Sequence, residues 1–119
     1  MSFNYIFWKG GVKMKIILIC AAGMSSSLIA NKMNKRFKEM GIEGHVDSFS
    51  SSELIARIDN YDFVLVGPQL RYLYKSICET CAEHDKPVVM IDPVSYGRQD
   101  AEKIIDQVQQ VLKEKNKNG

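Results

Sequence analysis

A short apolar run leads directly into a cysteine and a loop of small residues, and this segment constrains the fold more than any other. Ile16 to Ile19 are four consecutive aliphatic residues, mostly β-branched. Such a run suits a strand buried on both faces, as in a parallel sheet covered by helices. It ends at Cys20, and the small or polar residues Ala21 to Ser27 then enter a helical pattern near Leu28. The order strand, loop, helix predicts an α/β fold.

The same order recurs along the chain. Apolar runs predict strands at 16–19, 45–49, 63–66 and 88–91. Helical periodicity predicts a first helix from Ser26 or Ser27 to about Met40 and a short second helix after Glu53. Two longer helices are predicted from about Leu70 to His84 and from about Asp100 to Lys115. Right-handed crossovers between such units give a four-stranded parallel sheet of order 2-1-3-4, with helices on both faces in a three-layer α/β/α sandwich. That order places a topological switch point beside Cys20.

Apolar stripes and capping signals assign the faces of the helices. The first helix is expected to bury Leu28, Ile29, Met33 and Phe37, and the short second helix to carry Leu54, Ile55 and Ile58. Ser50 followed by Glu53 matches a capping box at the start of that second helix. A loop through Tyr96 and Gly97 is expected before the last helix.

The composition indicates one ordinary globular domain in a reducing compartment. The chain has 119 residues, of which 45% are hydrophobic, and a net charge of +2 that requires neither nucleic acid nor an anionic membrane as partner. No apolar run approaches the roughly 18 residues of a membrane span. Three cysteines fit a reducing cytosol better than a disulfide framework. We expect a cytoplasmic protein, monomeric in isolation.

The first thirteen residues differ from the rest. They include the apolar residues Phe3, Tyr5, Ile6, Phe7 and Trp8 but lack the basic start and small-residue cleavage site of a signal peptide. We predict that 1–13 is translated leader sequence and that the natural protein begins at Met14, with an apolar docking arm as the alternative. The domain is then expected to span 14–115, followed by a frayed polar tail at 116–119.

Cys20 is the candidate reactive residue. A small-residue loop can turn several backbone N–H groups inward, and the following helix adds a partial positive charge. A sulfur at the strand's end would then lie in an anion-binding nest that favours the thiolate and could hold a phosphoryl group. The alternative is a buried cysteine that packs as a small hydrophobe.

The other cysteines and the histidines favour structural roles. Cys78 and Cys81 have the spacing of a redox or zinc pair but fall late in a helix, and a zinc site would need two further ligands. Only His45 and His84 are available, and both suit the surface. We therefore expect no metal site.

Polar residues in two other loops could line the rim of the Cys20 site. Gln69, Arg71 and Tyr72 follow the third strand, and Asp92 follows the fourth. Asp92 suits a turn-initiating role better than proton transfer. Gly23 stands alone, without a dinucleotide fingerprint or a nucleotide-binding phosphate loop, and no cofactor is expected.

Three segments together resemble one protein family. Residues 17–28 (ILICAAGMSSSL), 66–69 (VGPQ) and 91–97 (IDPVSYG) are similar in order and spacing to the enzyme IIB component of the bacterial phosphoenolpyruvate-dependent sugar phosphotransferase system, lactose/cellobiose/chitobiose class. The resemblance covers essentially Met14 to Lys115. Pro93 departs from the family pattern, in which a less constrained residue is expected after the aspartate.

The resemblance implies a phosphocarrier. Cys20 would accept a phosphoryl group from a phosphohistidine on the IIA partner, and the group would then pass to a sugar bound by the membrane-embedded IIC partner. Residues Ala21, Ala22, Gly23, Met24, Ser25, Ser26 and Ser27 would form the phosphate-holding loop. Gln69 and Tyr72 match the family's second loop, and association with the membrane would occur through IIC.

Two other classes share this architecture. Low-molecular-weight tyrosine phosphatases and related arsenate reductases also place a cysteine after the first strand, but they need an arginine six positions later to clamp the phosphate. That position is Ser26 here, and Arg36 lies well inside the helix. The pair Asp92-Pro93 is the feature that favours a phosphatase. A flavodoxin-type module is a third hypothesis, for which Tyr72 and Tyr96 could stack on a flavin.

Overall fold

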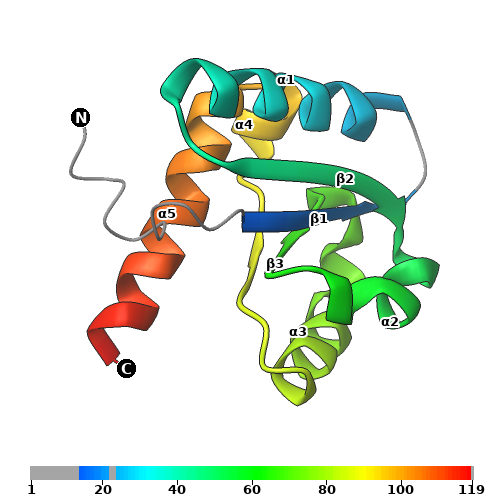
Figure 1. Cartoon of the computed structure of the whole chain (residues 1–119). Helices are drawn as coiled ribbons and strands as arrows, with labels where there is room; N and C mark the ends of the chain where they lie inside the picture. The colour runs from blue at the N-terminus through cyan, green and yellow to red at the C-terminus, as the bar shows by residue number, and fades with distance from the viewer. Residues whose placement is uncertain (1–13, 22–23, 119) are drawn as a thin grey trace.

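The computed structural model describes residues 14–21 and 24–118, with side chains for 14–21 and 26–114. Its helices and strands, in order, are β1 (Met14–Cys20), α1 (Met24–Met40), β2 (Gly44–Ser50), the 3-10 turn η2 (Ser51–Glu53), α2 (Leu54–Arg57), η3 (Ile58–Asn60), β3 (Phe63–Val66), η4 (Pro68–Leu73), α3 (Tyr74–Glu83), β4 (Val88–Met90), α4 (Pro93–Gly97) and α5 (Ala101–Asn118) (Figure 1). The predicted leader segment at 1–13 lies outside this description, so the start at Met14 stays a prediction.

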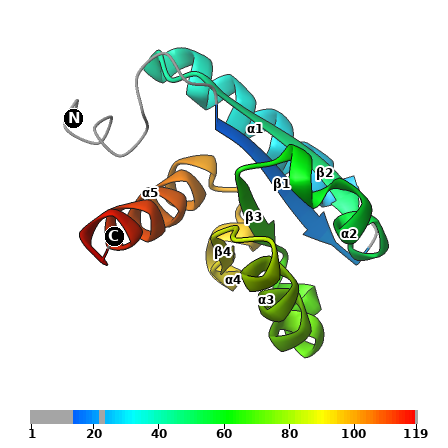
Figure 2. The ribbon, with the colours of Figure 1, turned by 60° about the horizontal axis from the view of Figure 1, so that its bottom comes forward.

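The four strands form one parallel sheet in the order β2-β1-β3-β4, which confirms the predicted topology. Cys20, the last residue of β1, pairs with Ser50, the last residue of β2. On the other side of β1, Ile19 pairs with Val66 at the end of β3. The carboxyl ends of the three strands therefore meet at one edge, and Figure 2 shows α2 beside the arrowhead end of β1.

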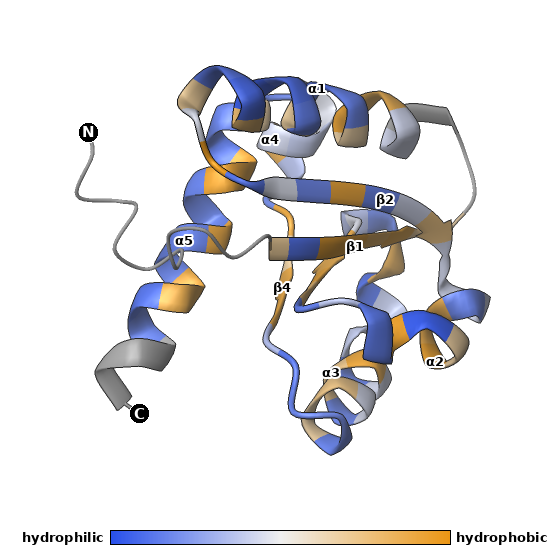
Figure 3. Ribbon diagram, viewed as in Figure 1, coloured by the Kyte–Doolittle hydropathy of each residue, from blue (hydrophilic) through white to orange (hydrophobic). Residues whose placement is uncertain are grey.

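Alternate residues of β1 face two separate hydrophobic layers. Ile16 and Leu18 pack with α1 and α5, whereas Ile17 and Ile19 pack with α2 and α3. All four are fully buried, and burial of such a side chain contributes about 1.5–3 kcal/mol. Figure 3 shows the apolar colour concentrated on β1 and on the inner stripes of the helices. The predicted three-layer arrangement is thus present, with the core divided by the sheet.

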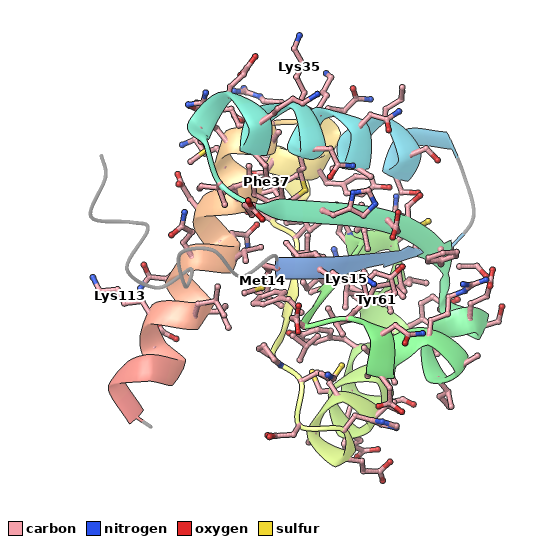
Figure 4. The ribbon with its side chains drawn as sticks, in the orientation of Figure 1. Met14, Lys15, Lys35, Phe37, Tyr61 and Lys113 are labelled. Carbon is pink, nitrogen blue, oxygen red and sulfur yellow. The ribbon has the colours of Figure 1, made fainter. Side chains whose placement is uncertain are left out.

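The apolar stripe of α1 is narrower than the sequence predicted. Ile29, Met33 and Phe37 recur every four residues and are buried, but Leu28 is 48% exposed. One residue along a helix turns the side chain by about 100°, so Leu28 falls beside the stripe rather than within it. In Figure 4, Phe37 points from α1 toward the sheet and Lys35 points away from it. The helix also begins at Met24, before the expected serine cap.

The predicted capping box after β2 is wrong. Ser50 makes no side-chain cap bond, and its hydroxyl lies 3.0 Å from that of Ser52 instead. Glu53 accepts a hydrogen bond from Arg57 at 2.8 Å, since this carboxylate has a cation one turn later. The helix α2 has only four residues between two 3-10 turns, so it presents one narrow inner face. Ile55 is consequently 70% exposed.

Three further helical segments differ from expectation. The predicted helix at 70–84 is divided, because Leu70 has non-helical backbone angles inside η4 and the α-helix begins only at Tyr74. The predicted loop before the last helix contains α4, whose N-cap Asp92 accepts a hydrogen bond from the Ser95 N–H at 3.0 Å. Pro93 in the first turn supplies a helical φ angle, which helps this short helix to form. The last helix ends at Asn118 rather than near Lys115.

Candidate functional site

Cys20 lies at the carboxyl end of a central strand, against the first turn of α1. Its side chain is almost wholly buried, with 5% of the residue exposed. The Sγ atom is 2.9 Å from Ser26 Oγ and 3.8 Å from the carbonyl oxygen of Phe49. A thiol can donate to that carbonyl, whereas a thiolate can accept a hydrogen bond from the serine hydroxyl. The sulfur therefore has one partner suited to each of its protonation states.

The loop after β3 approaches Cys20 through a glycine. The Gly67 N–H donates to the carbonyl oxygen of Ile19 at 2.9 Å. A Cβ atom at Gly67 would lie 3.6 Å from Cys20 Cβ and 2.6 Å from Gln69 Oε1. The absence of a side chain at Gly67 lets the loop and the Gln69 side chain come close to the end of β1. The loop was predicted from the sequence to lie at this end.

A shallow depression of about 250 Å³ opens beside the sulfur, and we call it the Cys20 depression. Its lining residues come from β1, α1, β2 and η2, and they are Cys20, Ser26, Ser27, Ser48, Phe49, Ser50 and Glu53. Three serines besides Ser26 line this space, and Glu53 is the charged residue among the lining. The residues contributed by β2 and η2 were missed from the sequence, because their place depends on the pairing of Cys20 with Ser50.

The predicted phosphate loop is described in part. Ala21 is exposed next to Cys20. Residues 22 and 23 lie outside the described chain, and 24 and 25 are described only by their backbone, in the first turn of α1. The role predicted for these residues in holding phosphate therefore stays a prediction.

The last two residues of the predicted loop do lie at the depression. Ser26 is 2% exposed and is bonded to the sulfur. Ser27 is exposed, with its hydroxyl 3.4 Å from that of Ser48 on β2. Both serines belong to the first turn of α1, and the partial positive charge at the start of a helix favours anions.

The predicted rim residues are dispersed. The Gln69 side chain lies against Gly67, whereas Tyr72 is 75% exposed. Asp92 follows β4, two strands away from β1, and its carboxylate is held by the N–H and the hydroxyl of Ser95. These three residues do not line the Cys20 depression, and Asp92 has the turn-forming role favoured from the sequence.

No arginine occupies the position that a phosphatase clamp requires. Ser26 stands there, and Arg36 lies ten residues further along α1, which is about 15 Å along the helix axis. The guanidinium of Arg36 is instead bonded to Glu102 at 2.6 Å and to Glu39 at 3.4 Å. Arg57 is nearer the depression, but it donates to Glu53 and stacks on the Phe49 ring, 4.0 Å from the ring centroid.

The surroundings of Cys78 and Cys81, both on α3, favour a structural role for these residues. Cys81 is fully buried, and burial together with the nearby Cys78 raises the pKa of its thiol to about 11. His45 bonds Asp47 at 2.8 Å, and His84 bonds Asp59 at 2.9 Å. Within the described ranges, no three histidine, cysteine or acidic side chains gather closely enough to hold a metal ion.

A larger hollow of about 500 Å³ lies at the opposite end of β2. It is lined by Asn34, Lys35, Lys38, Ile42, Glu43, Gly44 and His45. On β2 it reaches His45, which is about 10 Å along the strand from Ser48, where the Cys20 depression begins. No cysteine or serine is among these lining residues, so the Cys20 depression is the better candidate for covalent chemistry on a thiol.

Comparisons with known proteins agree on one family. The family described as "PTS system, Lactose/Cellobiose specific IIB subunit" matches residues 15–107. The oligo-beta-mannoside-specific EIIB component of Bacillus subtilis is 30% identical over 93 residues, which cover 78% of this chain and 90% of the relative. The cellobiose-specific EIIB component of Lactococcus lactis is 28% identical and covers 76% of this chain and 88% of the relative.

Two solved structures share the fold. The cellobiose-specific IIB component from Borrelia burgdorferi aligns with a TM-score of 0.73 and 28% identity, over 88% of this chain and 96% of that one. The lactose-specific IIB domain from Streptococcus pneumoniae aligns with a TM-score of 0.76 and 18% identity, over 83% of this chain and 97% of that one. In the part of the chain that the structure describes, we find no helix long and apolar enough to span a membrane.

Proposed function

The chain belongs to the lactose/cellobiose-specific IIB family of the phosphotransferase system, and from that premise we propose that Cys20 is the residue that carries the phosphoryl group. The family's role is sugar phosphotransfer. The position of the Cys20 sulfur supports the proposal: it lies at the carboxyl edge of the sheet, beside the start of α1 and an open depression. Ligands of α/β sheets bind at such edges.

The first step forms an S–P bond and breaks an N–P bond. The Cys20 thiolate attacks the phosphorus of a phosphohistidine on a IIA partner, and the histidine nitrogen leaves with the electron pair. In the second step a hydroxyl of the sugar attacks the same phosphorus, the S–P electron pair returns to Cys20, and the hydroxyl proton passes to a base. Both steps depend on positioning and on stabilising charge at the equatorial oxygens.

The described residues provide for this charge in three ways. The helix α1 begins near the end of β1, where Ser26 contacts Cys20, and the start of a helix has a partial positive charge that favours anions. The Ser26 hydroxyl, 2.9 Å from the sulfur, can donate to a thiolate or to the bridging sulfur of a thiophosphate. Ser27, Ser48 and Ser50 line the space in which the phosphoryl oxygens would lie, and their hydroxyls could donate to these oxygens.

Carrier chemistry fits these residues better than phosphatase chemistry. A phosphatase loop needs a bidentate arginine to stabilise the attack of water on the phosphorus. Ser26 occupies that position and is bonded to the cysteine, and Asp92 caps α4 rather than lining the depression. Slow hydrolysis is what a carrier needs, because the phosphoryl group must persist until the next protein binds.

Several wider assignments follow from the same proposal. The protein would work in the cytoplasm, between a IIA phosphohistidine protein and a membrane IIC permease, on a sugar of the cellobiose, lactose or chitobiose type. The domain that does this would be 14–115. A phosphoenolpyruvate-driven relay with purified partners, followed by mass mapping, tests the proposal: phosphate on Cys20 supports it, and phosphate on another residue contradicts it.

A further inference from the structure

The Cys20 depression contains a carboxylate, which is unexpected beside a group that would carry a phosphoryl anion. Glu53 ends η2, directly after β2, and lines the depression together with Cys20 and Ser26. Its side chain is 43% exposed, so it meets both the depression and solvent. A phosphoryl group on sulfur carries about two negative charges at neutral pH, and a carboxylate nearby repels it.

The position of Glu53 is fixed by one neighbour. Arg57, one helical turn later, donates from Nε to Glu53 Oε1 at 2.8 Å. The guanidinium also lies over the Phe49 ring, with Cζ 4.0 Å from the centroid. Phe49 in turn supplies the carbonyl oxygen that faces the Cys20 sulfur. The three residues Glu53, Arg57 and Phe49 thus form a continuous series of contacts that ends at the reactive sulfur.

We propose that Glu53 sets the stability of phosphocysteine, and that Arg57 moderates this effect as a positioning residue. This inference rests on the proposed function. The Glu53 carboxylate repels the phosphorylated sulfur and so keeps its phosphoryl group easy to transfer onward. Arg57 holds the carboxylate in place and offsets part of its charge, which keeps phosphorylation by the donor favourable. Glu53 and Arg57 together therefore balance acceptance of the phosphoryl group from the donor against its release to the sugar.

The Glu53 charge would act on the equilibrium of the first step, in which the phosphoryl group passes from phosphohistidine to Cys20. Phosphohistidine and the Cys20 thiolate form histidine and phosphocysteine, so the charge at the sulfur becomes more negative by about one unit. Replacing Glu53 by the neutral, similarly shaped glutamine removes the repulsion. We expect the equilibrium to shift toward phosphocysteine by about three- to tenfold, the size of one partly exposed charge acting on a dianion. Phosphoryl transfer onward to the sugar should slow correspondingly.

The charge effect can be measured without any partner. Iodoacetate is an anion and iodoacetamide is neutral, and both alkylate cysteine sulfur with loss of iodide. Mass mapping of the Cys20 peptide gives the rate constant for iodoacetate divided by the rate constant for iodoacetamide. In Glu53→Gln this ratio should rise about two- to fivefold, and the rise should shrink as salt screens the charge. Glu79→Gln, an exposed glutamate on α3, is the matched control and should leave the ratio unchanged.

The transfer experiment uses the full chain with a phosphoenolpyruvate-driven donor relay, and it measures the fraction of phosphocysteine at equilibrium. Glu53→Gln should raise that fraction and Arg57→Gln should lower it, whereas Glu79→Gln should match wild type. Arg57→Lys, which keeps the charge, should lie between wild type and Arg57→Gln.

The outcomes separate the two proposals. If wild-type protein gains no phosphate on Cys20, the proposed function fails and this inference fails with it. If wild-type Cys20 is phosphorylated but Glu53→Gln matches wild type in both the alkylation ratio and the transfer equilibrium, the inference alone is overturned. An increased alkylation ratio together with an increased phosphocysteine fraction supports it, because a structural defect would not favour the anionic reagent selectively.

Discussion

The sulfur of Cys20 lies 2.9 Å from the hydroxyl oxygen of Ser26, six residues further along the chain. Both side chains are buried, at 5% and 2% exposure of their residues. The contact joins the end of β1 to the first turn of α1, so the helix and the sulfur are fixed relative to each other. The residue six positions after the cysteine, here Ser26, is thus a hydrogen-bonding partner of the sulfur.

Ser26→Ala tests that contact. The variant loses a hydroxyl that can donate to the thiolate, and we expect phosphoryl transfer through Cys20 to slow by about tenfold, with about 1 kcal/mol lost in the free energy of unfolding. Rapid-quench measurement of Cys20 phosphorylation checks the rate, and urea unfolding checks stability. Ser27→Ala is the control, since its hydroxyl pairs with Ser48 at 3.4 Å on the rim, and it should slow transfer less. Equal effects in the two variants would contradict the assignment.

The other two cysteines should be dispensable for transfer. Cys78→Ala and Cys81→Ala remove sulfurs held on α3, away from the Cys20 depression. Cys81 is fully buried, so its truncation leaves a small cavity and should cost about 1–2 kcal/mol of unfolding free energy. Transfer assays and chemical denaturation of both variants check this. Loss of transfer in Cys78→Ala would show that the reactive sulfur has been assigned to the wrong residue.

The buried Tyr61 contacts Asp47, and this contact makes the free energy of unfolding depend on pH in the acid range. Burial alone would raise the pKa of the Asp47 carboxyl, but hydrogen bonds from Tyr61 and His45 outweigh it and lower that pKa below 3.8. The carboxylate's contribution to stability is therefore full above about pH 4 and is lost as the pH falls through the lowered value. Figure 4 shows Tyr61 beside Lys15, whose Nζ lies 5.3 Å from the ring centroid.

Tyr61→Phe removes the 2.7 Å hydrogen bond from the phenol to Asp47. More than a third of the Asp47 side chain is exposed, so solvent screening limits the expected loss to about 1 kcal/mol at pH 7. Denaturation curves should show the difference from wild type shrinking as the pH drops below 4. Tyr72→Phe, at a tyrosine that is 75% exposed, is the control and should change little. A difference that stays constant to low pH would argue against the coupling.

The strands could be predicted because their signal is local. Phe63 to Val66 is an apolar run with the same bounds as β3, and Cys20 ends β1 as expected. Helix faces were harder to assign, because Leu28 and Ile55 are apolar yet fall beside narrow stripes and stay exposed. The helix α4 had a sequence signal, an aspartate followed by proline, which fits a helix start as well as a turn.

The site could be predicted only along one segment of the chain. Cys20 and Ser26 belong to the same strand, loop and helix unit, whose order is visible in the sequence. Glu53 and Phe49 reach the depression because β2 pairs with β1 in a register that sets Cys20 beside Ser50. That register is fixed by packing of the whole sheet, so no local pattern marks these residues.

The most direct test of the account is to find which residue carries the phosphate. Wild-type protein and Cys20→Ser should be incubated with the same phosphoenolpyruvate-driven relay and mapped by mass spectrometry under conditions that preserve thiophosphate. We expect one phosphate on Cys20 in the wild type and none in Cys20→Ser, whose circular dichroism spectrum should match wild type. Phosphate on a histidine or on another cysteine, or undiminished phosphorylation of Cys20→Ser, would contradict the account.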